Sequence, residues 1–349
     1  MKQNIVISEN ITSDLSYAIN GCKHDRVFVL TDHNTREKCW GRIKDCPALR
    51  DAMLISIPPG DDNKTIDTLS MVWSRLGEHG ATRHSCMINL GGGMVTDLGG
   101  MAAATFKRGI NFINVPTTLL AMTDASTGGK TGVNFNGLKN EVGVFADSHC
   151  VIIDTAFLAT LDDMELRSGY AEMLKHSLLK DRETWAELMN YDLAHPDLHM
   201  LRGMVAKSIE VKRLVVEQDP LERGLRKALN LGHTIGHAVE SLAMRRGRPL
   251  PHGYAVAYGL AGELYMSARL AGLHTNVMHQ TARYISDYYG RADITCNDYD
   301  ELLELMSHDK KNIAGSTRFT LLGDIGDIRI DQTACREDIM EALDFMREG

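Results

Sequence analysis

The sequence predicts two domains of different class: an α/β domain over residues 1–155 and a mostly α-helical domain over residues 156–349. The chain has 349 residues, which is more than a single core usually holds. Strand-like and helix-like stretches alternate in the first part, as they do in parallel β-α-β units. After about residue 155 helical periodicity dominates.

Five short apolar runs in the first part predict strands, because each is rich in β-formers and most run into turn-forming residues. They are RVFVLT (26–31), AMLISI (52–57), SCMINL (85–90), NFINV (111–115) and CVIID (150–154). Helical patterns lie between them at residues 65–78 and 96–106. This alternation predicts a parallel sheet with helical crossovers.

The second part has one clear β-run, RFTLL (318–322), among helical stretches. These stretches cover residues 163–180, 197–217, 236–244, 254–271, 299–307 and 337–347. The predicted domain is therefore mostly helical.

The net charge of −8 and the pI near 6.0 argue against a nucleic-acid-binding protein, which normally has a basic excess. An anionic small substrate remains compatible with this charge, because a local cluster of Lys and Arg can hold it. No apolar run approaches the length of a membrane span, and the N-terminus shows no signal-peptide core. The seven scattered cysteines form no CxxC pair and indicate a reducing, cytoplasmic compartment.

A glycine-rich turn follows the third predicted strand, in INLGGGMVTDLGG. A strand, a glycine turn and a helix start aim backbone N–H groups at an anion. Gly91 and Gly93 match the first two glycines of a dinucleotide-binding fingerprint, but Thr96 stands at the third glycine position. A tight turn without a ligand is the alternative. Asp32 and Asn34, after the first predicted strand, can hold an adenosine ribose or simply cap a turn.

A polar stretch, VPTTLLAMTDASTGGKTGVNFNGLKN (115–140), predicts a loop after the fourth strand. It carries Asp124, Lys130, Lys139 and Asn140 among flexible glycines. Ordering such a loop costs conformational entropy, which ligand binding would offset. We therefore expect an anion site here, with a solvated surface loop as the alternative.

Three segments of the second part carry candidate metal ligands: Glu172 in SGYAEMLKH, His233 and His237 in NLGHTIGHAVE, and His252 in LPHGYAV. A carboxylate and two imidazoles that leave one position open are typical of a catalytic zinc site. His233 and His237 are four residues apart, so on a helix they would share one face. Spacing alone therefore favours these two as ligands, and the alternative is that the histidines are structural.

Several blocks occur in the order and spacing of one known family. They are GGGMVTDLGGMAAATFKRG, VPTTLLAMTDASTGGKTGVN, LKNEVGVF, GYAEMLKH, LNLGHTIGHAVE and HGYAVAYG. The sequence thus resembles the 3-dehydroquinate synthases, a family of sugar-phosphate cyclases, from about Asp32 to Asp309-Lys310-Lys311. The resemblance implies their fold, a Rossmann-like dinucleotide-binding domain followed by a helical metal- and substrate-binding domain.

The resemblance also implies two cofactors, NAD and Zn2+, with Co2+ as an alternative metal. Glu172, His233 and His252 would hold the metal, and His237 would face the substrate. The residues implied for NAD are Asp32, His33, Asn34, Asp61, Lys64, Gly92, Gly93, Met94, Val95, Asp97, Thr117, Thr118, Lys139, Phe157 and Thr160.

The implied substrate is an anionic sugar phosphate, 3-deoxy-D-arabino-heptulosonate 7-phosphate. The residues implied to meet it are Asp124, Lys130, Asn140, Lys175, Lys212, Arg226, Asn230 and Lys310, beside His237. Arg108 resembles the arginine that reaches the neighbouring phosphate site across a homodimer interface. The implied reaction is a transient NAD-dependent oxidation, β-elimination of phosphate, reduction, ring opening and aldol closure to 3-dehydroquinate.

The predicted helix starts give an expectation about where His233, His237 and His252 lie. If the helix begins near Gly236, then His233 and His237 need not share a helical face. His252 is expected to start a new helix after Pro249 and Pro251.

The sequence departs from the family at two positions. Tyr254 stands where the family has Glu in HGEAV, which removes a carboxylate near the metal, and Asp61 replaces a more usual Glu. Tyr254 keeps open a related cyclase, such as a 2-deoxy-scyllo-inosose or epi-valiolone synthase. A glycerol- or iron-alcohol-dehydrogenase-like enzyme, which would release NADH, and a catalytically inactive binding protein are the remaining competing functions.

Overall fold

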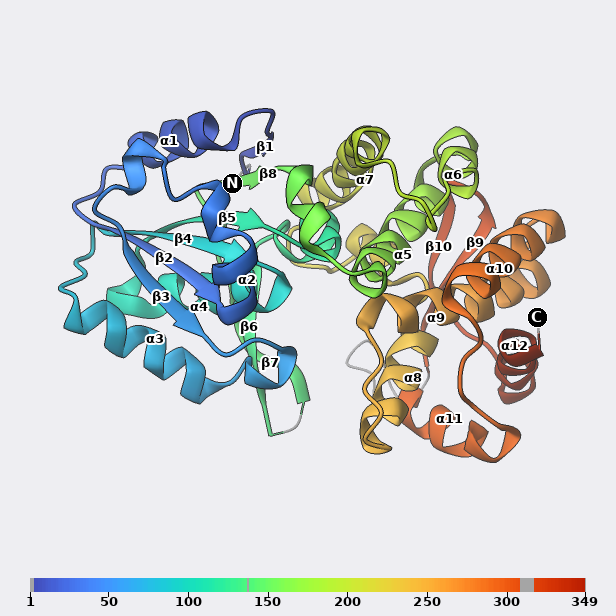
Figure 1. The fold of residues 1–349 in the computed structure, drawn as a ribbon. Coiled ribbons are helices and arrows are strands. Elements are labelled where there is room, and N and C mark those ends of the chain that lie inside the picture. The colour runs from blue at the N-terminus through green and yellow to red at the C-terminus, as the bar shows by residue number, and fades with distance from the viewer. Residues whose placement is uncertain (1–2, 137, 308–316, 349) are drawn as a thin grey trace. The chain divides into compact units, whose positions relative to one another are not determined.

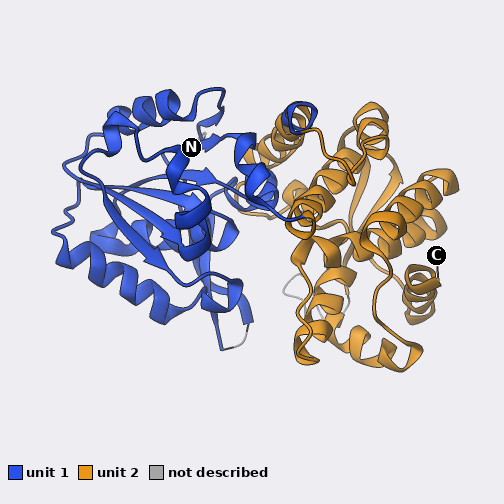
Figure 2. Cartoon of the chain, in the orientation of Figure 1, with its two compact units in different colours: residues 1–162, 198–202 blue, residues 163–197, 203–349 orange. Residues whose placement is uncertain are grey.

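The structure is a computed structural model that describes all residues except 1–2, 137, 308–316 and 349. The chain forms two compact units, shown in Figure 2. Unit 1 comprises residues 1–162 and 198–202, and unit 2 comprises residues 163–197 and 203–349. Unit 1 extends past the boundary expected near residue 155, because the short helix η6 (Thr155–Thr160) clusters with it.

Unit 1 is built on a six-stranded parallel sheet with the order β1-β8-β5-β4-β2-β3 (Figure 1). The strands are β1 (Ile5–Ile7), β2 (Val27–Asp32), β3 (Met53–Ile57), β4 (Cys86–Gly91), β5 (Asn111–Pro116) and β8 (Cys150–Ile153). All five predicted strands are present, and the sheet is parallel as the alternation of elements indicated. The sequence did not predict β1, since its three residues are too few to show a periodicity.

The helices of unit 1 cover both faces of this sheet. They are α1 (Ile11–Gly21), α2 (His33–Lys38), α3 (Ile66–Glu78) and α4 (Gly93–Thr105). The short helices are η1 (Trp40–Arg42), η2 (Pro47–Leu49), η3 (Asp61–Asn63), η4 (Phe106–Arg108), η5 (Ala121–Ala125) and η6. In Figure 1 α3 and α4 lie below the sheet and α1 lies above it. Leu69 and Leu76 of α3 share a fully buried core with Leu98 of α4 and with Phe28 and Leu30 of β2.

The polar stretch after β5 is more ordered than the predicted loop. It contains the short π-helix η5 and then an antiparallel hairpin of β6 (Lys130–Phe135) and β7 (Leu138–Phe145). Gly132 and Gly143 face each other across the hairpin. A Cβ on Gly143 would lie 2.2 Å from the carbonyl oxygen of Thr131, so these glycines serve close pairing of the strands rather than flexibility.

Unit 2 is mostly helical, as predicted. Its helices are α5 (Asp163–Lys180), α6 (Arg182–Met189), α7 (Leu198–Gln218), α8 (His233–Arg245), α9 (His252–Met266), α10 (Thr275–Tyr289), α11 (Tyr299–Ser307) and α12 (Arg336–Glu348), with the first residues of α7 counted in unit 1. It also contains the hairpin β9 (Phe319–Asp324) and β10 (Asp327–Gln332), and the short helices η7 (Leu225–Asn230), η8 (Ser267–Ala271) and η9 (Cys296–Asp298). The sequence did not predict α6, α10 or β10. The buried face of α10 includes Val277, Ala282 and Ile285 at helical spacing, so the sequence contained the pattern of this helix and the prediction missed it.

None of the helices in the described part of the chain combines the length and the apolar character that a membrane crossing needs.

Candidate metal centre and cofactor site

Three helices of unit 2 approach one another closely because glycines stand at their crossings. A Cβ on Gly253 of α9 would lie 1.8 Å from the carbonyl oxygen of Ser168 on α5. A Cβ on Gly259 of α9 would lie 1.9 Å from the carbonyl oxygen of Gly232, which precedes α8. Only glycine permits backbones to pack this tightly. The crossings bring side chains of α5, α8 and α9 to one place.

Glu172 of α5, His233 of α8 and His252 of α9 meet at this place. Oε1 of Glu172 lies 3.4 Å from Nε2 of His233 and 3.5 Å from Nε2 of His252. Oxygen and nitrogen ligands at ~2.0–2.2 Å from a tetrahedral zinc lie roughly 3.3–3.6 Å from one another. The two separations from Glu172 are therefore those that a tetrahedral metal requires, and a ring nitrogen of His233 lies within 4.8 Å of one of His252.

The burial of Glu172 supports the same fit. Its side chain is completely buried, and neither carboxylate oxygen accepts a hydrogen bond of ordinary geometry from the residues that the structure describes. Lys175, one turn along α5, is its ion-pair partner. A buried carboxylate with so few hydrogen bonds costs free energy unless a cation satisfies it. The donor set of one carboxylate and two imidazoles suits a divalent metal such as zinc.

His237 belongs to a second group that can hold a metal. One ring nitrogen from each of His233, His237 and His252 lies within 4.8 Å of the others. α8 begins at His233 and not near Gly236, so the expectation that His233 and His237 need not share a helical face was wrong. Their rings are 5.2 Å apart. The separations of 3.4 and 3.5 Å from Oε1 of Glu172 fit a tetrahedral site and are compatible with Glu172 as the third ligand and with His237 nearby.

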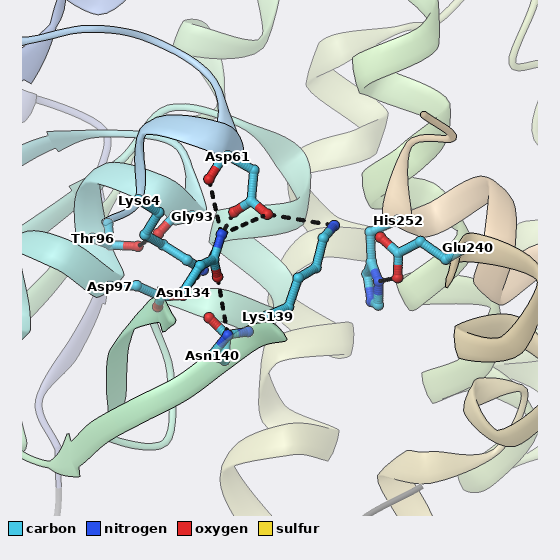
Figure 3. Close-up of polar contacts among 10 residues, drawn as sticks. All are labelled: Asp61, Lys64, Gly93, Thr96, Asp97, Asn134, Lys139, Asn140, Glu240 and His252. Atoms are coloured by element: carbon cyan, nitrogen blue, oxygen red, sulfur yellow. Dashed lines mark hydrogen bonds and ion pairs between the residues drawn. The ribbon is translucent and has the colours of Figure 1, made fainter. Parts of the chain in front are cut away.

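In His233 and His252, the other ring nitrogen, Nδ1, also contacts an oxygen atom. Nδ1 of His233 lies 3.1 Å from the carbonyl oxygen of Leu231, and Nδ1 of His252 lies 3.4 Å from Oε2 of Glu240 (Figure 3). Such partners fix the ring orientation and leave Nε2 for a metal. Glu240 was not among the residues expected from the sequence. Its spacing was a usable signal, because residues 233, 237 and 240 fall on one face of a helix.

Charges in the group shift its pKa values in opposite directions. Burial opposes ionisation of Glu172, but Lys175 and His233 outweigh it and hold the carboxyl pKa well below its usual value. Burial lowers the pKa of His233 to about 3, and the Lys175 charge acts in the same direction. For His252, the nearby carboxylates of Glu172 and Glu240 outweigh burial and raise the pKa to about 10. The carboxylates thus favour positive charge at His252, whereas burial and Lys175 keep His233 neutral, the form in which an imidazole binds a metal.

Tyr254, the departure from the family pattern, packs away from this chemistry. Its ring lies 5.1 Å from the ring of Tyr289 in an edge-on arrangement.

Cations expected to bind the substrate are buried in unit 2. Lys175, Lys212 and Arg226 are each at most 5% exposed. Nη1 of Arg226 donates to the carbonyl oxygen of Pro220. Asn230 donates to Oε1 of Glu222, a residue with a left-handed φ of 57° that was not expected from the sequence. Burying cations is costly, so buried Lys and Arg side chains are candidates for binding an anion. Lys310 lies outside the described residues.

In unit 1 the strand order reverses between β2 and β4, which are neighbours in the sheet. Ligands of open parallel sheets bind at the carboxyl ends of the strands at such a switch point. Asp32 is the last residue of β2 and accepts a hydrogen bond from the Thr35 backbone N–H, so its carboxylate caps α2. The adjacent His33 and Asn34 are exposed at the start of α2.

The glycine turn after β4 faces the same edge. α4 begins at Gly93, earlier than the expected Thr96, and its N-cap Gly92 has no side chain to cap it. A Cβ on Gly92 would lie 3.0 Å from Thr118, and the Thr117 N–H donates to the Gly91 carbonyl oxygen. Gly93, Met94 and Val95 thus form the first turn of α4, with backbone N–H groups directed at the turn.

An ion network around the buried Lys64 lies beside this turn (Figure 3). Nζ of Lys64 lies 3.1 Å from Oδ2 of Asp97 and 3.4 Å from Oδ1 of Asp61. Burial would lower the pKa of Lys64, but the two carboxylates outweigh it and raise this pKa. Burial raises the pKa of Asp97 even though Lys64 opposes this shift.

The hairpin β6–β7 joins this network. Lys139 of β7 lies 3.4 Å from Oδ2 of Asp61. Asn134 of β6 donates to the Asp61 carbonyl oxygen, and its own side-chain oxygen accepts from the Asn140 N–H. The structure thus brings together Asp61, Lys64, Asp97 and Lys139, four of the residues that the family resemblance implied for NAD. Asn134, whose amide links the hairpin to η3, was not expected from the sequence.

The remaining expected residues of unit 1 have the following surroundings, and Asp124 is near enough to Asp97 to raise its pKa. Phe157 is fully buried with the Arg42 guanidinium 5.4 Å above its ring, and the Thr160 hydroxyl donates to the Phe157 carbonyl oxygen. Asp124 lies in η5, and Lys130 is exposed at the start of β6. Arg108 is exposed after α4 and has a φ of 70°. This left-handed conformation is strained for a residue other than glycine and is frequent at functional sites.

Family models match most of the chain. The model described as 3-dehydroquinate synthase N-terminal matches residues 54–168, and the model described as 3-dehydroquinate synthase C-terminal matches residues 169–312. The chain is 49% identical over 348 residues to the 3-dehydroquinate synthase of Parabacteroides distasonis, with 100% of this chain and 99% of the relative covered. It is 35% identical to that of Clostridium botulinum, with 93% of each chain covered.

Solved structures share the fold at lower identity. The 2-epi-5-epi-valiolone synthase of Streptomyces hygroscopicus, solved with NAD+ and Zn2+, has a TM-score of 0.86 and 25% identity and covers 98% of this chain and 96% of its own. A 2-deoxy-scyllo-inosose synthase complexed with carbaglucose-6-phosphate, NAD+ and Co2+ has a TM-score of 0.85, 22% identity and the same coverage. An iron-containing alcohol dehydrogenase from Thermococcus thioreducens has a TM-score of 0.71 and 14% identity, with 98% and 97% covered.

Proposed function

The chain belongs to the 3-dehydroquinate synthase family, and from this membership we propose that it converts 3-deoxy-D-arabino-heptulosonate 7-phosphate into 3-dehydroquinate and phosphate. It is then a carbon–oxygen lyase acting on phosphate, the second enzyme of the shikimate pathway of aromatic amino-acid biosynthesis. The observation that carries the proposal is the convergence of Glu172, His233 and His252 in a chain whose two halves both match the family. Full-length identity favours dehydroquinate synthases over the other cyclases and the dehydrogenases, which match at 25% or less.

The proposed cofactors are one divalent metal, zinc or cobalt, and NAD. When bound, the metal lowers the pKa of a substrate hydroxyl, and NAD+ accepts a hydride and later returns it. Glu172, His233 and His252 hold the metal. Because the hydride returns in each turnover, NAD is required but no NADH accumulates.

The side chains of unit 2 supply the charge and the protons. Lys212 and Arg226 are buried cations that can bind phosphate or carboxylate, and the planar Arg226 guanidinium can do so with two hydrogen bonds. Lys175 is held beside the metal ligand Glu172 and can contact a substrate oxygen. His237 lies one turn after His233, and its imidazole can hold or transfer a proton. Asn230 can donate to and accept from hydroxyl groups.

The first unit binds NAD in this proposal. The first turn of α4, from Gly93 to Val95, receives the pyrophosphate, because its N–H groups lack helical partners. The exposed His33 and Asn34 lie at the same switch point and face the adenosine ribose. The family resemblance assigns Asp124, Lys130, Asn140 and Lys310 to the substrate.

We further propose a cytoplasmic homodimer in which Arg108 reaches the phosphate site of the partner subunit. The strained backbone at Arg108 supports a functional role. The hairpin β6–β7 supports association, because five of its large apolar side chains are more than a third exposed. These side chains are Phe135, Leu138, Val142, Val144 and Phe145. The seven free cysteines suit a reducing compartment.

The test of the proposed function is product identification. Incubation with NAD+, Zn2+ and the heptulosonate phosphate should yield one phosphate and one 3-dehydroquinate per substrate, measured by NMR, with no net rise in NADH absorbance. Glu172→Gln should lose metal and activity, whereas the matched control Glu187→Gln on α6 should retain both. Phosphate release with a different carbocycle would assign the chain to another cyclase, and stoichiometric NADH would make it a dehydrogenase.

A further inference from the structure

The N-terminus of α8, which carries His233, is capped by a carboxylate from a different helix. Gly232 is the N-cap residue and has a left-handed φ of 79° and no side chain to offer. Helices leave their first N–H groups without partners inside the helix. In α8 these donors are buried, so another group has to accept from them.

Glu263 of α9 is that group. Its Oε2 accepts from the Gly232 N–H at 2.6 Å, and its Oε1 accepts from the N–H groups of Thr234 at 2.9 Å and Ile235 at 3.2 Å. The Glu263 residue is completely buried. Three charge-assisted hydrogen bonds and the positive end of the helix stabilise its negative charge there.

His233 lies inside the turn that Glu263 holds. The residues on either side of it, Gly232 and Thr234, both donate backbone N–H groups to this carboxylate. The His233 ring is itself oriented by the contact of Nδ1 with the Leu231 carbonyl oxygen. The position of Nε2, 3.4 Å from Glu172, therefore depends on where Glu263 fixes the backbone.

His252 and Glu263 are on the same helix, about three turns apart, and so project from the same face of α9. α9 thus contributes one metal ligand directly and holds the turn that carries the other. The close approach of Gly259 to the Gly232 carbonyl oxygen brings the two backbones near enough for this arrangement.

We propose that Glu263 is a positioning residue for the metal centre: it anchors the first turn of α8 so that His233 meets the same metal as Glu172 and His252. This proposal rests on the proposed metal site and extends it to a residue that acts on a ligand only through the backbone. Glu263→Gln keeps the size of the side chain but replaces one acceptor oxygen with an NH2 group. That group faces a backbone N–H donor, so the turn has to move.

The experiment compares zinc affinity, by competition with a chromophoric chelator, between the intact protein and Glu263→Gln. We expect zinc binding about 10–100-fold weaker in the variant, the usual effect of losing a group that orients a metal ligand. The visible spectrum of the Co2+-loaded variant should also change, because the coordination geometry at His233 is altered. A merely structural role would lower thermal stability and leave both readouts unchanged.

The matched control is Asp181→Ala, which removes the side-chain cap of α6 in the same unit. It should lower the melting temperature and leave zinc affinity unchanged. If Glu263→Gln does not fold, Glu263→Asp retains the charge but shortens the reach, and should weaken zinc binding in the same direction.

The proposal is overturned if a folded Glu263→Gln or Glu263→Asp variant binds zinc within about twofold of the intact protein. The expected weakening is about 10-fold or more. The variant His252→Ala distinguishes a failure of the Glu263 proposal from a failure of the proposed metal site. Loss of zinc in that variant with full affinity in Glu263→Gln would reject the role of Glu263 alone, whereas retained zinc would reject the ligand set.

Discussion

Two residues, His233 and His252, can share a metal either with Glu172 or with His237. Separation favours Glu172, whose oxygen lies at the spacing of a tetrahedral site. Charge favours it as well, because a carboxylate neutralises part of the metal charge in a buried environment.

Substitution of the two histidines separates these roles. His237→Ala should keep about one metal per chain and lose roughly 10²–10⁴-fold in activity, because a proton-transfer group or substrate contact is removed. His252→Ala should lose the metal, because a ligand and its link to Glu240 disappear. Metal content of both purified variants, measured by mass spectrometry, checks the prediction. An empty His237→Ala protein beside a fully loaded His252→Ala protein would reverse the ligand assignment.

At the scale of elements, glycines decide how α8 and α9 cross. Gly232, Gly236 and Gly259 all face the backbone of the other helix or of the turn before it. These residues are the glycines of LNLGHTIGH and HGYAVAYG, so the same motifs that carry the histidines also bring their helices together. The chemistry and the packing are therefore encoded in the same short segments.

Gly259→Ala tests this crossing. A Cβ there would lie 1.9 Å from the Gly232 carbonyl oxygen, so the helices have to separate, at a cost of about 1–3 kcal/mol in unfolding free energy. Zinc binding should weaken in parallel, because His233 and His252 move apart. Chemical denaturation and chelator competition measure the two effects.

Gly203→Ala on α7 is the matched control. No atom of the described residues lies within 4 Å of a Cβ at this helical position. The substitution should stabilise the protein by about 0.4–1 kcal/mol through the reduced entropy of the unfolded chain. Equal destabilisation in both variants would show that crowding at the crossing is not the cause.

At the scale of the whole molecule, the proposed homodimer makes each phosphate site depend on two chains. Arg108 lies in unit 1, exposed and with a strained backbone, and forms no ion pair within the described ranges 3–136, 138–307 and 317–348. Lys212 is buried in unit 2. If Arg108 serves the partner subunit, then defects at the two positions can complement each other.

Mixed dimers test this arrangement. Arg108→Ala and Lys212→Ala homodimers should each be inactive, since each site lacks one phosphate-binding cation. In a heterodimer of the two chains, one site has both wild-type residues and the other has neither, so activity should return to roughly half per dimer. Differently tagged chains purified together provide the sample for a phosphate-release assay. Absence of recovery in demonstrably mixed dimers would place Arg108 within its own subunit.

Much of the fold was readable from the sequence because it depends on local patterns. The apolar runs of β2, β3, β4, β5 and β8 predicted these strands, and the amphipathic patterns of α3 and α11 predicted those helices. Short or polar elements were missed, since β1 has three residues and the hairpin β6–β7 is exposed along β7. The proposed activity, and the residues assigned to it, were inferred from the sequence blocks that resemble the family.

The sequence by itself determined the parallel sheet, the helical second unit, the glycine turn and the family, because each depends on residue order and spacing. It did not determine which side chains meet. Helical spacing pairs His233 with His237, and only the crossing of α5, α8 and α9 places Nε2 of His233 and of His252 at 3.4 and 3.5 Å from Oε1 of Glu172. The partners Asn134 and Glu263 likewise became visible only in three dimensions, whereas Glu240 could have been suspected from its helical spacing to His233 and His237. Contacts between residues distant in the sequence depend on helix packing, and no local pattern specifies that packing.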